Sequence, residues 1–198
     1  MENKIEQPNS ETQQISHYDT ITQLNLIVLN KPSNIEIEQI KSDIESQIIK
    51  VNKQFQDFML LFDETTKQFE NIPLIYFSDL QNVKKPIEIL QIIMNMLFNI
   101  FKNTQTKWIE WVDIISMMRK ESLLQLLKSF KIEECSKLCI DHVKKKIKHE
   151  EGWSLDKANR CSMFVGIMAS WIECVVEYHG INTNLVMLRE ELSFVNSN

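Results

Sequence analysis

A pair of apolar heptad seams, far apart in the chain, most constrains its fold. The first steps alternately by three and four residues and consists of Ile48, Val51, Phe55, Phe58, Phe62, Thr65, Phe69 and Ile72. The second consists of Ile181, Leu185, Leu188, Leu192 and Val195. This repeat is typical of helices that pair as a coiled coil. Because the intervening chain must return to where it left, the seams predict an antiparallel helical pair.

Glycine and proline are scarce, with 3 Gly and 4 Pro in 198 residues. Such a composition favours long helices over the frequent turns of an all-β protein. The length fits one domain, or one domain with an extension. We therefore expect an all-α fold, in which a small helical bundle forms a head on a short antiparallel coiled coil.

Four segments follow from these patterns. Residues 1–34 form an N-terminal segment that we expect to be disordered or extended, because its first part is polar. Its apolar run at 24–29 fits either a strand or a short buried helix. Residues 35–82 form the outgoing coiled-coil helix, which Pro73 should kink or end. Residues 83–180 form the helical head, and residues 181–198 form the short return helix.

The head contains several amphipathic stretches. We expect a helix from Pro86 to Phe101, buried on most sides, because its few polar residues share one stripe. Further helices are expected from Trp108 to Met118, and then over 123–130 and 135–147. The last helix of the head has its large apolar residues at helical spacing, and Ser154 should cap a short helix before it. Those residues are Cys161, Phe164, Val165, Met168, Trp171, Val175 and Tyr178.

The first seam extends upstream beyond the reach of the return helix. Ile37, Ile40 and Ile44 continue it toward the N-terminus from Ile48. An apolar seam without a partner needs to be covered. We therefore expect these four isoleucines to meet a coiled-coil partner chain.

The net charge of −5 is unevenly distributed. Residues 81–160 carry 15 basic and 10 acidic side chains, a net charge of +5, whereas the flanking regions are acidic. The densest cluster is formed by the lysines at 144–146 and Lys148. We interpret this run as a solvated helix face, which is the commoner role of such a sequence.

Metal, cofactor and nucleic-acid sites find little support in the sequence. Cys135, Cys139 and His142 share one helical face, but structural zinc sites usually have closely paired cysteines. We expect no metal and no cofactor, and we interpret the four cysteines as reduced core thiols. The Trp108 and Trp111 pair is expected in the core, so we predict no nucleic-acid binding. No segment is apolar enough to predict a membrane span.

Three segments of the head have a shared order and spacing. They are VKKPIEILQIIMNML at 83–97, WVDIISMMRKESLLQLLKSF at 111–130, and the closing helix with Trp153, Ser162, Trp171 and Tyr178. Together they resemble the stalk and microtubule-binding head of dynein heavy chains, over about residues 48–195. The first segment is similar to the family's turn from the outgoing stalk helix into the first head helix, and the four closing residues are in register with the family's closing helix. The second segment departs from the family where Arg119-Lys120 replaces a Gly-Asp turn.

The resemblance implies binding to the tubulin dimer through the first, third and last helices of the head. In the family, the stalk couples that contact to a distant ATPase ring. No GxxxxGK[ST] phosphate loop is present here, so we expect a protein that is not an enzyme. The initiating Met1 and the polar leader favour a stand-alone gene product over a piece of a heavy chain.

Carried onto this chain, the resemblance gives six candidate residues for binding microtubules or another partner. Lys84 and Lys85 retain a basic character before the first head helix, and Lys128 and Lys131 do so near the third. Gln91 and Glu173 stand where the family often has basic residues. Because tubulin is acidic, these two departures should weaken binding or redirect it to another protein.

We therefore expect a non-catalytic microtubule- or axoneme-associated protein, cytoplasmic and cytoskeletal, with the cilium as its location. Its partner would be tubulin or another axonemal protein. The alternative is a structural adaptor that uses the stalk-head fold to dock other proteins in a larger ciliary or cytoskeletal assembly.

Overall fold

The computed structural model describes residues 34–117 and 119–197, and every regular element among them is helical. The predicted all-α fold is confirmed. The expectations for the N-terminal segment, including 24–29, fall outside the described residues. In chain order the elements are α2 (Asn34–Glu70), α3 (Leu74–Gln81), α4 (Glu88–Lys102), α5 (Trp111–Met117), α6 (Lys120–Ser129), the 3-10 turn η1 (Ile132–Glu134), α7 (Lys137–His149), α8 (Leu155–Cys161) and α9 (Met163–Ser197).

The described residues fall into two compact units. Unit 1 contains the described segments 34–47 and 191–197, and unit 2 contains residues 48–190. Within unit 1, Ile44 and Val195 are buried. Unit 2 contains the main core and all of the head helices, and it is the part that positions the candidate site.

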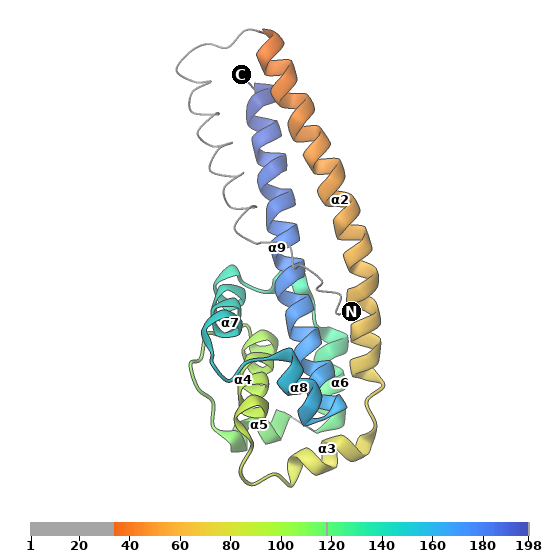
Figure 1. The fold of residues 1–198 in the computed structure, drawn as a ribbon, viewed down its shortest axis with the longest axis vertical. Coiled ribbons are helices and arrows are strands. Elements are labelled where there is room, and N and C mark those ends of the chain that lie inside the picture. Colours follow the sequence, from red (N-terminus) through yellow and green to blue (C-terminus); the bar gives the residue numbers. More distant parts are fainter. Residues whose placement is uncertain (1–33, 118, 198) are drawn as a thin grey trace, which may run out of the picture. The chain divides into compact units, whose positions relative to one another are not determined.

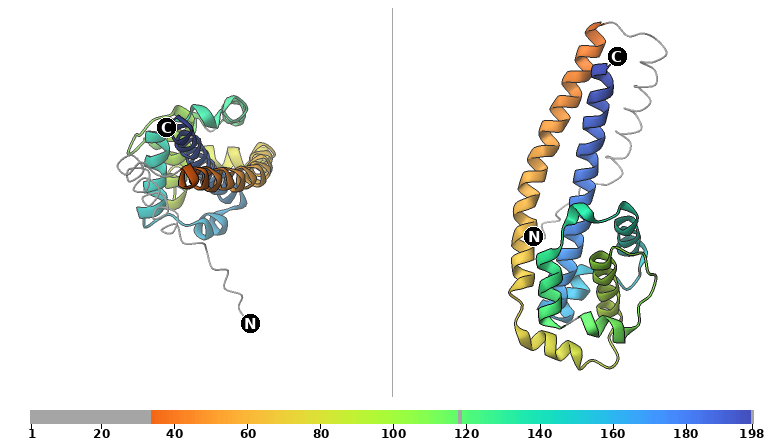
Figure 2. Two further views of the ribbon diagram at one scale, coloured as in Figure 1. Left: turned by 90° about the horizontal axis from the view of Figure 1, so that it is seen from above. Right: turned by 180° about the vertical axis from the view of Figure 1, so that it is seen from behind.

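Within unit 2, α2 and α9 pair in antiparallel fashion, as the two seams predict (Figures 1 and 2). Val51 packs in one buried cluster with Leu185 and Leu188. Farther along α2, the ring of Phe55 lies 5.3 Å from that of Tyr178. Because residue numbers rise along one helix as they fall along the other, the direction of pairing follows from these contacts.

Trp171 stands at the centre of the head, with 1% of its surface exposed. Four phenylalanine rings from three other segments lie within 5.0–6.3 Å of its ring, measured between centroids. They are Phe62, Phe69, Phe101 and Phe130. The indole therefore ties α9 to α2, α4 and the end of α6, and aromatic burial of this kind dominates core energetics.

α4 is the most enclosed helix of the head, since it contacts α5, α7 and α8. Its two buried asparagines, Asn95 and Asn99, hold the loop that follows it. Asn95 Oδ1 accepts a hydrogen bond from Ile109 N at 2.9 Å, and Asn99 Oδ1 accepts one from Thr106 N at 2.7 Å. The polar stripe predicted for this helix thus faces backbone groups that would otherwise lack partners.

One predicted boundary is confirmed and another is wrong. The outgoing segment expected over 35–82 breaks near Pro73, as predicted, because α2 ends at Glu70 and Pro73 is the N-cap of a separate helix, α3. The return helix expected to begin at 181 is continuous with the last head helix, because α9 runs from Met163 to Ser197 through Gly180. A single exposed glycine lowers helix stability by about 1 kcal/mol, too little to break a helix that is packed on both sides of it.

The local caps agree better with expectation. Ser154 Oγ accepts a hydrogen bond from Lys157 N at 3.3 Å and starts α8, as predicted. Ser162 Oγ accepts one from Val165 N at 3.2 Å at the start of α9. Two predicted core residues are exposed. Cys161 ends α8 and is exposed, whereas the other three cysteines are buried. Trp108 is 55% exposed because it lies in the loop before α5, so its predicted place in the core is wrong.

Candidate interaction surface

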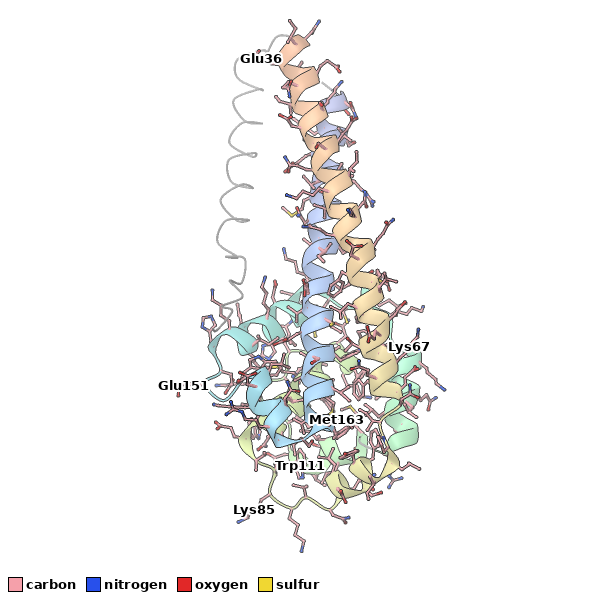
Figure 3. All side chains as sticks on the ribbon, turned by 45° about the vertical axis from the view of Figure 1, so that its right-hand side comes forward. Glu36, Lys67, Lys85, Trp111, Glu151 and Met163 are labelled. Atoms are coloured by element: carbon pink, nitrogen blue, oxygen red, sulfur yellow. The ribbon has the colours of Figure 1, made fainter. Side chains whose placement is uncertain are left out.

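Lys84 and Lys85 lie in the 82–87 loop between α3 and α4, and both are exposed. Trp111 holds this loop, since its Nε1 donates a hydrogen bond to Val83 O at 2.7 Å. Lys85 points away from the head in Figure 3. The loop therefore presents two neighbouring ammonium groups on a backbone that is anchored to α5.

The helix before this loop rests on the start of α9. The ring of Phe77 in α3 lies 5.1 Å from that of Phe164, and the ring of Tyr76 stacks on the same Phe164 at 6.1 Å. We use the name distal end for α3, the 82–87 loop and the first turn of α9. It is the end of unit 2 at which α9 begins (Figure 1).

Lys128 and Lys131 lie elsewhere, at the end of α6 and just after it. Both are exposed, and Lys131 Nζ forms an ion pair with Glu134 Oε1 at 2.8 Å. Hydrogen bonding to Glu134 and the charge of that carboxylate raise the pKa of Lys131. One of the four candidate lysines therefore already has a local counter-ion.

The two lysine pairs are not brought together. The distal end adjoins Phe164, whereas the segment after Lys131 adjoins Tyr178, whose hydroxyl donates a hydrogen bond to Glu133 Oε1 at 2.9 Å. At 1.5 Å per helical residue, Phe164 and Tyr178 are separated by about 21 Å along α9. The six candidate residues therefore do not form one compact site.

Gln91 and Glu173 are both half-buried. Gln91 O accepts a hydrogen bond from Asn95 Nδ2 at 2.9 Å within α4. Burial raises the pKa of Glu173, while a hydrogen bond with the Trp153 side chain opposes that rise. Their side chains are less available to a partner than those of the exposed lysines.

The isoleucine seam is largely covered. Ile44 is 2% exposed, and Ile37 and Ile40 are half-buried. Ile48, in unit 2, packs against the cluster of Val51, Leu185 and Leu188. The premise that Ile44 and Ile48 lack cover within this chain is therefore wrong, and the return helix reaches farther than expected.

The cysteines and histidine that could have begun a zinc site have other surroundings. Cys139 Sγ donates a hydrogen bond to Asn99 O at 3.3 Å, and burial raises the pKa of the Cys135 thiol to about 11. Burial, together with the charges of Lys146 and Lys145, lowers the pKa of His142. Within residues 34–117 and 119–197, no group of three or more His, Cys, Asp or Glu side chains is placed to hold a metal ion.

Exposed apolar side chains at the distal end are a feature that sequence reasoning missed. Leu74 and Ile75 of α3 are 58% and 63% exposed, and Ile87 in the adjacent loop is 54% exposed. The sequence predicts Leu74 and Ile75 within the outgoing helix, and Ile87 at the opening of the next one. The signal that could have found them is the apolar run immediately after Pro73, which a proline at a helix start would present as a new element.

The Arg119-Lys120 substitution retains a corner. α5 ends at Met117, α6 begins at Lys120, and Arg119 has an extended backbone with φ −64° and ψ 130°. Arg119 therefore interrupts the helical segments. Of the described helices, none is both long and apolar enough to cross a membrane.

The fold defined by these contacts is an all-α head on an antiparallel helical pair. No family model matches the chain. Over 158 residues, 80% of its length, the chain is 20% identical to a protein named "Dynein heavy chain-like protein 1" from Plasmodium falciparum (isolate 3D7). The chain spans about 3% of the length of that relative. The comparison supports a distant relationship to a dynein heavy chain-like protein.

Proposed function

We propose that this chain is a non-catalytic microtubule- or axoneme-associated protein that contacts its partner through the distal end. The observation that carries the proposal is the pair Lys84 and Lys85, both exposed in a loop that Trp111 anchors. The distant similarity to a dynein heavy chain-like protein supports the same choice. The partner would be tubulin or another acidic cytoskeletal protein, and the location would be cytoplasmic, with the cilium as one setting.

The chemistry of the distal end suits an acidic protein surface. Two adjacent ammonium groups gain Coulomb energy from carboxylates, and that gain decreases as salt screens it. Leu74, Ile75 and Ile87 add exposed apolar area close to the same loop. Burying such area supplies a contribution that salt does not weaken. We therefore expect binding that weakens with salt without disappearing.

Co-sedimentation with microtubules at about 25 mM and about 150 mM salt tests the proposal, because screening grows over that range. We expect the protein to pellet at low salt and to pellet less at the higher salt. Lys84→Glu/Lys85→Glu should reduce pelleting at both. Lys50→Glu/Lys53→Glu is the matched control, since it makes the same charge change on exposed positions of α2.

The proposal fails if folded wild-type protein pellets at neither salt concentration. It also fails if both double variants lose binding equally, because that result would reflect net charge alone. Circular dichroism of each variant confirms that the helices are intact before binding is compared.

A structural adaptor is the second candidate, and exposed apolar residues on α2 favour it. Ile49, Leu60 and Leu61 are 70%, 72% and 51% exposed within unit 2. Side chains of this kind often mark protein contacts. If Leu60→Ser/Leu61→Ser abolishes association in sedimentation equilibrium while microtubule pelleting is absent, the adaptor is preferred. Monomeric wild-type protein would exclude self-association through this face.

A further inference from the structure

The outward face of α7 carries four exposed lysines in one stripe. Lys137, Lys144 and Lys148 are seven and four residues apart, so they lie above one another on a helix. Lys145 borders the same stripe, and Asp141 is its one acidic residue. The opposite side of α7 is apolar and faces the core through Cys139, Ile140 and Val143. The stripe therefore faces solvent.

Carboxylates balance these lysines only in part. Asp141 lies on the same stripe, and among the described residues the ion pairs Lys41–Glu38 and Lys131–Glu134 do not involve α7. The nearest polar contact is made by Lys146, whose Nζ donates a hydrogen bond to Lys107 O at 2.9 Å. Its hydrogen-bond partner is thus a backbone carbonyl, while the charge of Glu150 opposes the lowering of the Lys146 pKa by burial.

Helix stability alone does not explain the stripe. Cations near the C-terminus of a helix are favourable, which accounts for Lys148. Lys137, however, occupies the first turn, immediately after the N-cap Ser136, where a cation opposes the helix dipole. Lys144 and Lys148 are a like-charged pair at i and i+4, a spacing that destabilises a helix by a few tenths of a kcal/mol. Asp141 is spaced to pair with Lys137 at i and i+4, which offsets part of this cost. Four lysines against one carboxylate still leave the stripe with a net positive charge.

Neighbouring groups experience this positive charge. Burial lowers the pKa of His179 on α9, and Lys137 and Lys144 lower it further, against the opposing effect of Asp141. The pKa of His142 is likewise lowered by burial and then by Lys146 and Lys145. His179 is therefore close enough to sense both the lysines of the stripe and Asp141.

We propose that the face of α7 formed by Lys137, Lys144, Lys145 and Lys148 is a second interaction surface, which binds an acidic, extended polypeptide segment. From Lys137 to Lys148 the stripe spans about 16 Å, which about five residues of extended chain would cover. The surface lies on a different helix from the distal end, and the inference does not depend on microtubule binding.

The occupant is a polypeptide because the rest of the chain disfavours larger polyanions. With a net charge of −5, the protein repels an extended polyanion such as duplex DNA or an anionic membrane. At physiological salt, charges farther than about 8 Å away are largely screened. A short acidic segment bound to α7 therefore interacts mainly with the lysines of that helix. The stripe also consists of lysines alone, without the arginines that recognise phosphate in a bidentate manner.

Fluorescence anisotropy with a labelled oligo-glutamate peptide of about ten residues tests the proposal. The full chain should bind the peptide at about 25 mM salt and bind it more weakly at about 150 mM. Lys144→Glu/Lys148→Glu should weaken binding at least about tenfold, as expected when attraction becomes repulsion. Lys50→Glu/Lys53→Glu makes the same charge change on α2 and should alter binding less than about twofold.

Three results would overturn the proposal. The first is no binding of the peptide to folded protein at the lower salt. The second is an equal loss in both double variants. The third is tighter binding to duplex DNA, or to vesicles that contain phosphatidylserine, that the α7 variant abolishes, because the occupant would then be a different polyanion.

Discussion

Trp171 Nε1 donates a hydrogen bond to Thr66 Oγ1 at 3.2 Å, and this bond joins α9 to α2 inside the aromatic core of unit 2. The indole is 1% exposed, so its N–H has no access to bulk water. A single hydroxyl thus satisfies the polar atom of the largest fully buried side chain. The bond also fixes which residues of the two long helices face each other.

The first prediction concerns that hydroxyl. Thr66→Val leaves the buried indole N–H without an acceptor and should lower the free energy of unfolding by about 1–3 kcal/mol. Thr66→Ser keeps an acceptor and should lose less. Urea denaturation followed by circular dichroism measures both variants. Equal losses in Val and Ser variants would mean that the methyl group of Thr66 matters and the hydrogen bond does not.

The second prediction concerns Asn99, whose side chain bonds Thr104, Thr106 and Asn95. Asn99→Ala removes these bonds from a side chain that is fully buried, and it should cost about 3 kcal/mol. Asn71 is a matched control, since its Nδ2 donates to Lys67 O at 2.9 Å in an exposed position. Asn71→Ala should change the free energy of unfolding by less than about 0.5 kcal/mol. Similar losses at both sites would refute the role of Asn99 in holding the loop.

The third prediction uses two glycines of α9. A Cβ at Gly166 would overlap the Asn159 side chain and lie 3.2 Å from Asn159 Cα, so Gly166→Ala should destabilise the protein by about 1 kcal/mol. A Cβ at Gly180 meets nothing within 4 Å. Gly180→Ala should therefore stabilise a continuous helix by about 0.5–1 kcal/mol. Thermal unfolding measures both, and destabilisation by Gly180→Ala would indicate that the helix is broken there.

The fourth prediction concerns pH. Burial raises the pKa of Glu173, so the folded protein holds this proton more tightly than the unfolded chain does. The stabilising contribution is present at low pH and is lost as pH rises through the raised pKa. Relative to wild type, Glu173→Gln should therefore become progressively more stable from about pH 4 to about pH 7. The measurement is the free energy of unfolding across that range.

A second variant separates the two causes of the Glu173 shift. The Trp153 hydrogen bond favours the charged carboxylate, so Trp153→Phe should raise the pKa of Glu173 further. Its stability should then decrease more steeply with pH than that of wild type. The double variant with Glu173→Gln should lose this extra slope, and persistence of the slope would assign it to another group.

Much of the fold was predictable because its signals are periodic. The seams identified the buried stripes of α2 and α9, and Val51, Phe58 and Phe69 are buried as their spacing predicts. The sequence predicts the break near Pro73 but not the short helix α3, because eight residues give little periodic signal. The helix boundary predicted at Gly180 is wrong, because the low helix propensity of one glycine is outweighed by packing along α9.

The candidate site was harder to predict, because it depends on which segments meet. Sequence spacing could not reveal that the segments containing Lys84 and Lys131 lie beside different parts of α9. Their separation depends on Phe77 packing on Phe164 and on Glu133 bonding Tyr178. The roles of Asn95 and Asn99 were also hidden, since a polar stripe on a buried helix does not say which loop it holds.

Cross-linking tests the proposed function most directly. A zero-length carbodiimide reagent, applied to the protein bound to microtubules, joins lysines to carboxylates that they contact, and mass spectrometry identifies the residues. The account predicts links from Lys84 or Lys85 to tubulin carboxylates. Pelleted complexes in which neither lysine is linked, while other lysines of the chain are, would contradict contact through the distal end.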